Sequence, residues 1–245
     1  MKVFYRIAES TNPEHDRRRT WQQKPINATK QHCLETTLAS FPTAEFTIYV
    51  DGITPETFAW LKSLECDRIH IKKIEAGSEA KSFRILIDDA CLLDDNEIVL
   101  LQEDDYLYLP GGEVAITEAL QYANYATCYL HPSHFDLPQR GGNIFVTQQN
   151  VSEITRVVRT NSRMWMMTNS TTCTFAVKAK TLKEDRGEWF VGTSDLIGSK
   201  DFDTFITLRK KGRSVLMPIP SLSTHALRGY EAPLVGTGLT SWEQI

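Results

Sequence analysis

The sequence predicts an α/β protein in which a mixed sheet is flanked by helices and the whole chain forms a single composite domain. Two observations carry this prediction. Short β-rich runs alternate with helical stretches over the first 130 residues, which is typical of a doubly wound α/β unit. The continuous apolar run at 97–102 then has the composition of a strand buried on both faces, as in a parallel sheet.

The first elements follow in order along the chain. Residues 3–7 form the first predicted strand, and the polar stretch after it, to about residue 25, is expected to be a loop. Helical spacing of apolar residues predicts a helix over 28–39. The run at 45–52 is rich in β-branched and aromatic residues and ends in an Asp-Gly pair, so it is predicted as a strand and turn.

The next elements carry clearer boundary signals. Thr54 is expected to cap a helix that has Pro55 at its first position and continues through residue 64. Alternation predicts a strand over 68–74. A helix over 78–93 is predicted because four residues fall on one apolar face, namely Phe83, Leu86, Ile87 and Ala90.

The second half is less regular, with strands expected at 143–147, 154–159 and 172–177. A last helix is predicted over 199–211, with Gly212 ending it. No linker, repeat or low-complexity segment separates the halves. We therefore expect residues 1–130 and 131–245 to be two halves of the same domain.

Charge is distributed unevenly along the 245 residues, whose formal net charge is −4. The remainder of the chain outside the 55 residues 85–139 carries 27 basic and 20 acidic groups, a net of +7, which suits anionic partners. The segment 85–139 contains no Lys or Arg and eleven carboxylates: Asp88, Asp89, Asp94, Asp95, Glu97, Glu103, Asp104, Asp105, Glu113, Glu118 and Asp136.

Composition also excludes several classes of protein. No run of about 18 apolar residues is present, so no membrane span is expected, and residues 1–6 lack the apolar core of a secretory signal. The five cysteines are widely spread and form no C-x-x-C motif, which argues against structural zinc and a disulfide framework. We expect a cytoplasmic protein, and we infer no obligate protein partner.

The triplet Glu103, Asp104 and Asp105 directly follows the buried strand. Ligands of open α/β sheets bind at the carboxyl ends of the strands. On an extended backbone residues 103 and 105 point to the same side, where both could reach one ion. Hard cations such as Mg²⁺ are held by one or two carboxylates together with substrate phosphates. The alternative is a solvated acidic turn before Pro110, but the preceding strand favours a metal site.

At this point the chain resembles the GT-A fold of nucleotide-sugar-dependent glycosyltransferases, in particular glycosyltransferase family 2. The triplet stands where that family has its Asp-x-Asp motif, after Val50-Asp51-Gly52 and a helix carrying Lys81 and Arg84. Residues 198–203 are similar to the segment that carries the catalytic base of inverting members, and 218–225 to the late strand whose histidine completes the metal site. Two departures are the Glu at the start of the triplet and Lys200, where an acidic residue often precedes the base.

The resemblance implies that residues 1–130 bind the nucleotide sugar and that 131–245 supply the acceptor site and the catalytic base. It also implies a role for each residue of the site. Glu103, Asp105 and His225 would hold Mn²⁺ or Mg²⁺, and the imidazole favours Mn²⁺. Asp201 is the first choice for the base that takes the acceptor proton, Asp203 the second, and the transfer is expected to invert configuration. The donor, a nucleotide sugar and by expectation a UDP-sugar, would contact Arg6, Ala8, Glu9, Asp51, Gly77, Lys81, Arg84 and Asp104.

The acceptor site is predicted around Arg163 and Trp165, because an aromatic and methionine surface can stack on a sugar ring, although such residues also form cores. The acceptor is unknown, and a glycan, a small molecule or modified DNA would fit. Two alternatives stay open. A nucleotidyltransferase would use the same carboxylates with Mg²⁺, but the loop after the first strand lacks its glycines. A non-catalytic sugar or nucleic-acid binding module would leave the acidic triplet unexplained.

Overall fold

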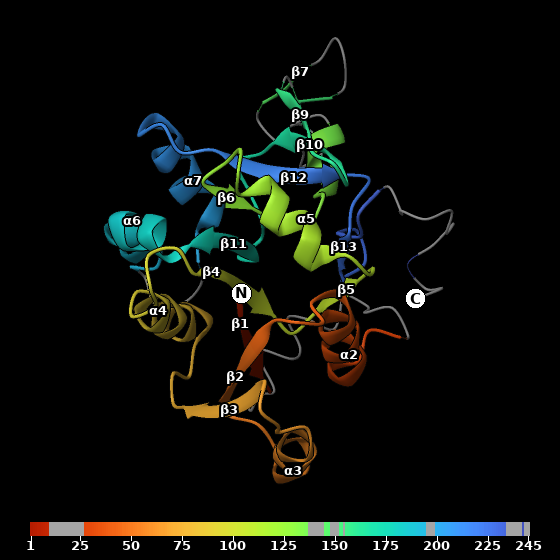
Figure 1. The fold of residues 1–245 in the computed structure, drawn as a ribbon, viewed down its shortest axis with the longest axis vertical. Helices are drawn as coiled ribbons and strands as arrows, with labels where there is room; N and C mark the ends of the chain where they lie inside the picture. Colours follow the sequence, from red (N-terminus) through yellow and green to blue (C-terminus); the bar gives the residue numbers. More distant parts are fainter. Residues whose placement is uncertain are drawn as a thin grey trace.

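The computed structural model describes residues 1–9, 27–136, 145–147, 152–153, 155–194, 199–233 and 242. Its main feature is a nine-stranded mixed sheet with the order β3-β2-β1-β4-β11-β6-β12-β10-β9 (Figure 1). This one sheet takes strands from both halves of the sequence. The predicted α/β class, with a mixed sheet flanked by helices, is confirmed.

The amino-terminal half forms the parallel end of the sheet, where β3, β2, β1 and β4 are successive neighbours. Their carboxyl ends therefore meet at one edge. The elements of this half are β1 (Lys2–Ala8), α2 (Lys30–Ser40), β2 (Glu45–Asp51), α3 (Pro55–Ser63), β3 (Ile69–Ile74), α4 (Glu79–Ala90), β4 (Ile98–Glu103), β5 (Tyr106–Tyr108), α5 (Gly112–Ala119) and β6 (Tyr125–Ala126).

The carboxyl-terminal half makes the sheet mixed, because β11 runs antiparallel to both β4 and β6. A short separate sheet pairs β13 with β5. The elements of this half are η1 (Pro132–Phe135), β7 (Val146–Thr147), β8 (Ser152–Glu153), β9 (Val157–Arg159), β10 (Met164–Met167), β11 (Phe175–Lys178), α6 (Ala179–Gly192), α7 (Asp201–Lys210), β12 (Val215–Ile219) and β13 (Ser223–His225).

Helix ends follow the capping signals of the sequence. The side chain of Thr54 accepts a hydrogen bond from the amide of Thr57 at the start of α3, and Ser78 caps α4 in the same way. Gly212, with φ +86°, follows α7 in a conformation that favours glycine. These three predicted boundaries are confirmed.

Two apolar layers cover the two faces of the sheet. In β1 the side chains of Val3, Tyr5 and Ile7 pack into one cluster with residues of α2 and α5. Phe4 belongs to the other cluster, which includes residues of α4, α6 and α7. Figure 1 shows α4, α6 and α7 together on one side of the sheet. Alternation along β1 and β4 thus decides which polar side chain at the strand ends faces which layer.

Some expectations differ from the structure. The strand expected at 172–177 begins only at Phe175, because Thr172 and Cys173 have φ values of 49° and 58°. The sequence did not predict the helices α5 and α6. The expected loop before residue 25 and parts of the strands expected at 143–147 and 154–159 lie outside the described residues. None of the helices in the described ranges combines the length and apolar character that crossing a membrane requires.

Candidate active site

The acidic triplet lies at the carboxyl end of β4, in the middle of the sheet. Glu103 is the last residue of β4, and Asp104 and Asp105 turn the chain into β5. Strand β13 pairs with β5 so that His225 is opposite Tyr106. The amide of Ala226 also donates to the backbone oxygen of Asp105 at 2.7 Å. These backbone contacts bring a residue of the late strand to the triplet.

The structure brings together the three predicted metal ligands. One ligand atom from each of Glu103, Asp105 and His225 lies within 4.8 Å of the other two. His225 Nε2 is 3.2 Å from Asp105 Oδ2, and the imidazole stacks on the Tyr106 ring with centroids 4.9 Å apart. Two carboxylates and one imidazole form a donor set that suits a divalent cation and favours Mn²⁺ over Mg²⁺. The residues present therefore fit the implied metal.

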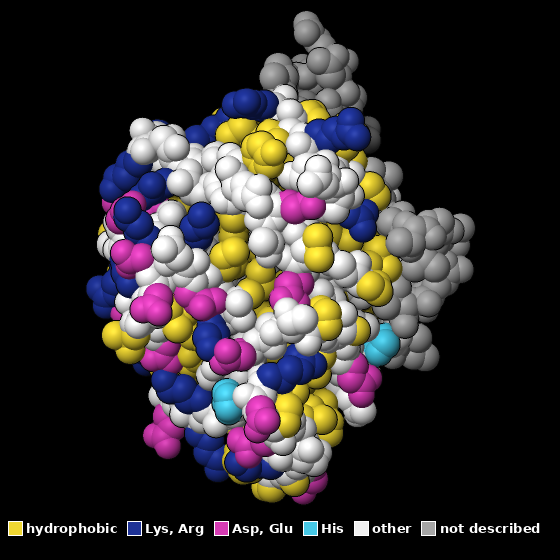
Figure 2. All heavy atoms as spheres, in the orientation of Figure 1, with side chains coloured by type: hydrophobic (Ala, Val, Ile, Leu, Met, Phe, Trp, Pro, Cys, Tyr) yellow, Lys and Arg dark blue, Asp and Glu magenta, His cyan; other side chains and the backbone are white. Residues whose placement is uncertain are grey.

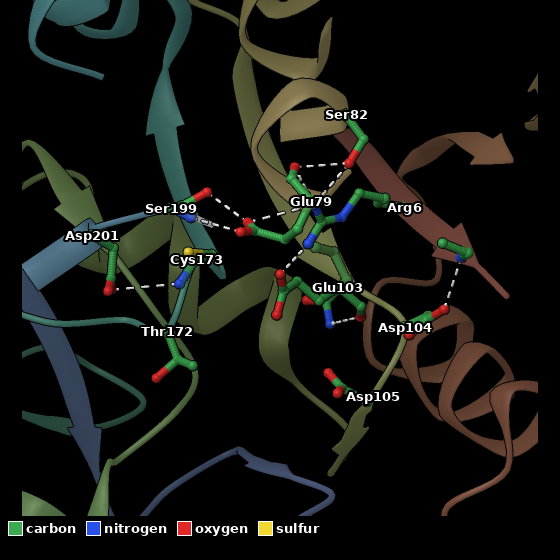
Figure 3. A network of polar contacts seen from close by, with 12 residues as sticks. Arg6, Glu79, Ser82, Glu103, Asp104, Asp105, Thr172, Cys173, Ser199 and Asp201 are labelled. Atoms are coloured by element: carbon green, nitrogen blue, oxygen red, sulfur yellow. Dashed lines mark hydrogen bonds and ion pairs between the residues drawn. The ribbon is translucent and has the colours of Figure 1, made fainter. Parts of the chain in front are cut away.

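Arg6 forms a buried ion pair with Glu103, beside which it lies in the parallel register of β1 and β4. Arg6 Nη1 also donates to the backbone oxygen of Glu79 at 2.7 Å and to Ser82 Oγ at 2.8 Å. Burial raises the pKa of Glu103; the Arg6 guanidinium opposes this rise, and the Asp105 carboxylate adds to it. Arg6 is thus held within the protein by carboxylates and by the first turn of α4 (Figure 3).

The other residues predicted at the end of β1 are engaged in local contacts. The amide of Ala8 donates to Asp104 Oδ2 at 3.0 Å, and the same carboxylate forms an ion pair with Lys30 of α2. The carboxylate of Glu9 accepts hydrogen bonds from the amide of Thr54 and the hydroxyl of Thr57, which begin α3. Asp104 and Glu9 therefore fix the polypeptide around the strand ends.

Asp51 orders the loop between β3 and α4. Its two carboxylate oxygens accept the amides of Ala76 and Gly77 at 3.1 and 2.9 Å. Gly77 has φ +66°, a conformation that side chains rarely adopt, and its amide points at Asp51 as a result. Two of the predicted donor-binding residues, Asp51 and Gly77, are therefore joined in one turn.

The two basic residues predicted on α4 have different environments. Lys81 is exposed. Arg84 instead bonds to α6: its Nε donates to Thr193 Oγ1 and its guanidinium to the backbone oxygen of Phe190, both at 2.7 Å. The polar contacts of Arg84 hold α6 against α4, and its role in binding the donor stays a prediction.

The two candidate bases lie on different faces of α7. Asp201 is buried, and its Oδ2 accepts the amide of Thr171 at 2.7 Å, the hydroxyl of Ser170 at 3.2 Å and the amide of Cys173 at 3.4 Å. Burial raises the pKa of Asp201, while these hydrogen bonds oppose the rise. Asp203 is exposed. Figure 3 shows Asp201 with its hydrogen bond from the Cys173 amide, in the same view as Ser199 and Glu79.

The predicted acceptor residues separate as well. Trp165 is fully buried in β10, and its indole nitrogen donates to Thr160 Oγ1 at 3.1 Å, so in this structure the ring offers no exposed face for the predicted stacking on an acceptor. Arg163 is half-buried, and Arg159 of the edge strand β9 is exposed. Figure 2 shows basic and hydrophobic side chains together at the top of the molecule, where Figure 1 places β9 and β10. The exposed hydrophobic residues of these strands are Val157 and Met164.

Sequence analysis missed Glu79, which contacts both halves of the site. Its carboxylate accepts the amide and the hydroxyl of Ser199 at 2.6 and 2.5 Å, and lies 3.5 Å from Arg6 Nη1. The spacing of α4 carries the signal for this contact. Phe83 and Leu86 follow Glu79 at i+4 and i+7, so the apolar face of the helix continues to this carboxylate.

No protein-family model and no curated protein matches the sequence. Among solved structures, the chain is similar to GalNAc-T7 with UDP, GalNAc and Mn²⁺, at a TM-score of 0.56 and 11% identity over 94% of this chain and 44% of that one. It is also similar to the galactosyltransferase LgtC in complex with donor and acceptor sugar analogues, at a TM-score of 0.48 and 12% identity over 89% of this chain and 73% of that one. A third similar structure is the bifunctional IspDF from Campylobacter jejuni, at a TM-score of 0.45 and 13% identity over 88% of this chain and 48% of that one.

The chain thus spans less than half the length of GalNAc-T7. Of the three structures just named, GalNAc-T7 has a TM-score above 0.5. Because the sequence identity is 11%, this similarity shows the arrangement of the backbone alone. It agrees with the parallel β3-β2-β1-β4 order and with the position of the acidic triplet at the end of β4. The chain has the GT-A fold.

Proposed function

We propose that the chain is a metal-dependent glycosyltransferase that transfers a sugar from a nucleotide sugar to an acceptor hydroxyl, with inversion at the anomeric carbon. One observation carries the proposal: two carboxylates and an imidazole converge at the carboxyl end of the central strand of a GT-A sheet. This edge is where open α/β sheets bind their ligands. A non-catalytic binding module gives no reason for such a cluster.

On the donor side, the edge formed by β1, β2 and β4 would receive the nucleotide. Glu103, Asp105 and His225 would hold Mn²⁺ or Mg²⁺, and the ion, when bound, supplies positive charge to the diphosphate leaving group. The turn that Asp51 forms with the Ala76 and Gly77 amides would shape the nucleotide pocket. Exposed Lys81, near the amino terminus of α4, would add positive charge for the phosphates.

On the acceptor side, Asp201 would act as the base. The acceptor oxygen forms a bond to the anomeric carbon as the bond from that carbon to the diphosphate oxygen breaks. The hydroxyl proton passes to Asp201, and the electron pair of the broken bond leaves with the nucleoside diphosphate. The raised pKa of Asp201 suits a base, because a carboxylate with a higher pKa accepts a proton more readily.

The acceptor surface would include Arg163 and the exposed Arg159. Neither guanidinium has an ion-pair partner in the part of the chain that the structure describes. Such groups favour an anionic or strongly polar acceptor. A glycan, a small molecule and modified DNA all remain within this proposal.

The test is to incubate the purified chain with a panel of sugar nucleotides and Mn²⁺ and to measure free nucleoside diphosphate. Metal-dependent release from one donor supports the proposal, and chelation by EDTA should abolish the release. Pyrophosphate release from a nucleoside triphosphate would instead identify a nucleotidyltransferase. Binding of a sugar nucleotide with no turnover in the presence of any acceptor class would favour a binding module. The last two results would each overturn the proposal.

A further inference from the structure

Glu79 links two segments that are 120 residues apart. It lies in the first turn of α4, and its carboxylate accepts both the amide and the hydroxyl of Ser199, at 2.6 and 2.5 Å. Ser199 precedes α7, the helix that begins with Asp201. A single side chain of the amino-terminal half thus holds the backbone at the entrance to the helix that carries the candidate base.

The same carboxylate connects to the metal side of the site. Glu79 Oε1 lies 3.5 Å from Arg6 Nη1, and the Arg6 guanidinium forms its ion pair with Glu103. Ser199, Glu79, Arg6 and Glu103 therefore form a continuous chain of polar contacts across the sheet edge (Figure 3). Arg6 is buried and pairs with both carboxylates, so its positive charge offsets the repulsion between them.

The start of α7 depends on such an external partner. Lys200, at the N-cap position of α7, makes no side-chain capping bond. The helix entrance is instead fixed by three contacts: Glu79 accepts the Ser199 amide, the backbone oxygen of Gly192 accepts the Lys200 amide at 3.0 Å, and the loop 170–173 donates to Asp201. A carboxylate close to the amino termini of α4 and α7 also lies at the positive ends of both helix dipoles.

We propose that Glu79 is a positioning residue, which acts through Ser199 and Arg6 to hold Asp201 at a fixed place relative to the Glu103 end of β4. The inference rests on the proposed function for its catalytic consequence. Small displacements of a reacting group lower a rate without weakening the binding of either substrate, so the effect of Glu79 should fall on kcat.

Three variants and one control test this role. Glu79→Gln keeps the length of the side chain and one accepting oxygen but removes the charge that faces Arg6. Glu79→Ala removes both contacts, and Ser199→Ala removes only the hydroxyl bond. Glu56→Gln is the matched control, since Glu56 is an exposed acidic residue in the first turn of α3.

We expect kcat to fall roughly tenfold in Glu79→Gln and up to about 100-fold in Glu79→Ala. The donor KM and the Mn²⁺ Kd, measured by titration with the metal alone, should stay within about twofold of wild type, and Glu56→Gln should change none of them. Ser199→Ala should lower kcat less, and combining it with Glu79→Ala should add nothing further. Additive losses, an unchanged kcat, or a loss of Mn²⁺ affinity as large as that of kcat would overturn the role.

Hydrogen exchange tests the positioning without any turnover. Peptides at the start of α7 should exchange faster in Glu79→Ala than in wild type, while peptides of α3 should not change. Unchanged exchange at α7 would refute the positioning role even if the protein transfers sugar. If the wild-type chain releases no nucleoside diphosphate from any sugar nucleotide, the proposed function is refuted. Faster exchange at α7 in Glu79→Ala would then still support the link from Glu79 to α7. Should Glu79→Ala fail to fold, Glu79→Gln and Ser199→Ala carry both measurements.

Discussion

His225 Nε2 lies 3.2 Å from Asp105 Oδ2, although 120 residues separate the two along the chain. The pairing of β13 with β5 sets this approach, because it places His225 opposite Tyr106, the residue after Asp105. The candidate metal site is therefore built by both halves of the sequence. Neither half contains the full donor set, and the short separate sheet of β5 and β13 brings its members together.

The two candidate bases can be separated by paired substitutions. Asp201→Asn should lower kcat roughly 10²- to 10⁴-fold, since it removes the proton acceptor, whereas exposed Asp203→Asn should have little effect. Burial raises the pKa of Asp201, so wild-type kcat should fall with decreasing pH starting above the range usual for an aspartate. Steady-state rates over a pH series measure both effects. A larger loss in Asp203→Asn would reverse the assignment.

Asp51 should matter for donor binding through the loop that it holds. Asp51→Ala leaves the Ala76 and Gly77 amides without their carboxylate acceptor, so we expect a higher donor KM and a loss of about 1–3 kcal/mol in the free energy of unfolding. Asp51→Asn retains one accepting oxygen and should lie between Asp51→Ala and wild type. Donor KM and urea unfolding measure the two quantities. An unchanged KM in Asp51→Ala would remove this loop from the donor site.

The burial of Trp165 predicts a stability effect without a binding effect. Trp165→Phe leaves a space in the core and removes the hydrogen bond to Thr160, which together should cost about 1–3 kcal/mol of unfolding free energy. Acceptor KM should not change, because the fully buried indole offers no surface to a ligand. Urea unfolding and acceptor titration provide the check. A rise in acceptor KM at undiminished stability would restore the role that the sequence suggested.

His131 should make the fold sensitive to acid. Burial lowers the pKa of His131 to about 4, with help from His134 and His225, and its Nδ1 accepts the amide of Ser133 at 3.0 Å. The folded pKa is below the ordinary value of 6.5, so the stabilisation is complete above pH 6.5 and is lost as the pH falls towards 4.

The full loss amounts to up to about 3 kcal/mol of unfolding free energy. His131→Asn keeps a capping acceptor but cannot take up a proton in this range, so the stability difference between it and wild type should change between pH 6.5 and 4. Unfolding titrations of both proteins at several pH values measure this difference. A difference that is constant with pH would show that His131 does not titrate as its surroundings imply.

Local signals predicted the amino-terminal half of the fold well, because each element there has its own pattern. The apolar run of β4 and the cap Thr54 are examples. Helix α6 lacks such a pattern. Its buried positions include Asp185, which is held by an ion pair with Arg213 and a hydrogen bond from Tyr125 rather than by apolar packing. Partners so distant in sequence cannot be read from periodicity.

The site shows the same division. The triplet at 103–105 was predictable because it follows a buried strand, and the structure brings His225 to it. On α4 the basic charges drew attention to Arg84, which bonds to α6, while Glu79 joins the polar network of Arg6 and Ser199. Trp165 was undecidable from sequence, since its burial depends on the apolar cluster that packs on that face of the sheet.

The most direct test of the metal site compares Mn²⁺ affinity and metal-dependent nucleoside diphosphate release in Asp105→Asn, His225→Gln and Asp104→Asn. The first two should lose at least about 100-fold in Mn²⁺ affinity, with turnover falling in parallel, because each removes or weakens a direct ligand. Asp104→Asn should keep its Mn²⁺ affinity, because the Asp104 carboxylate of the wild type faces Ala8 and Lys30. A folded Asp105→Asn protein that binds Mn²⁺ as tightly as wild type and keeps full metal-dependent turnover would contradict the assignment of the site.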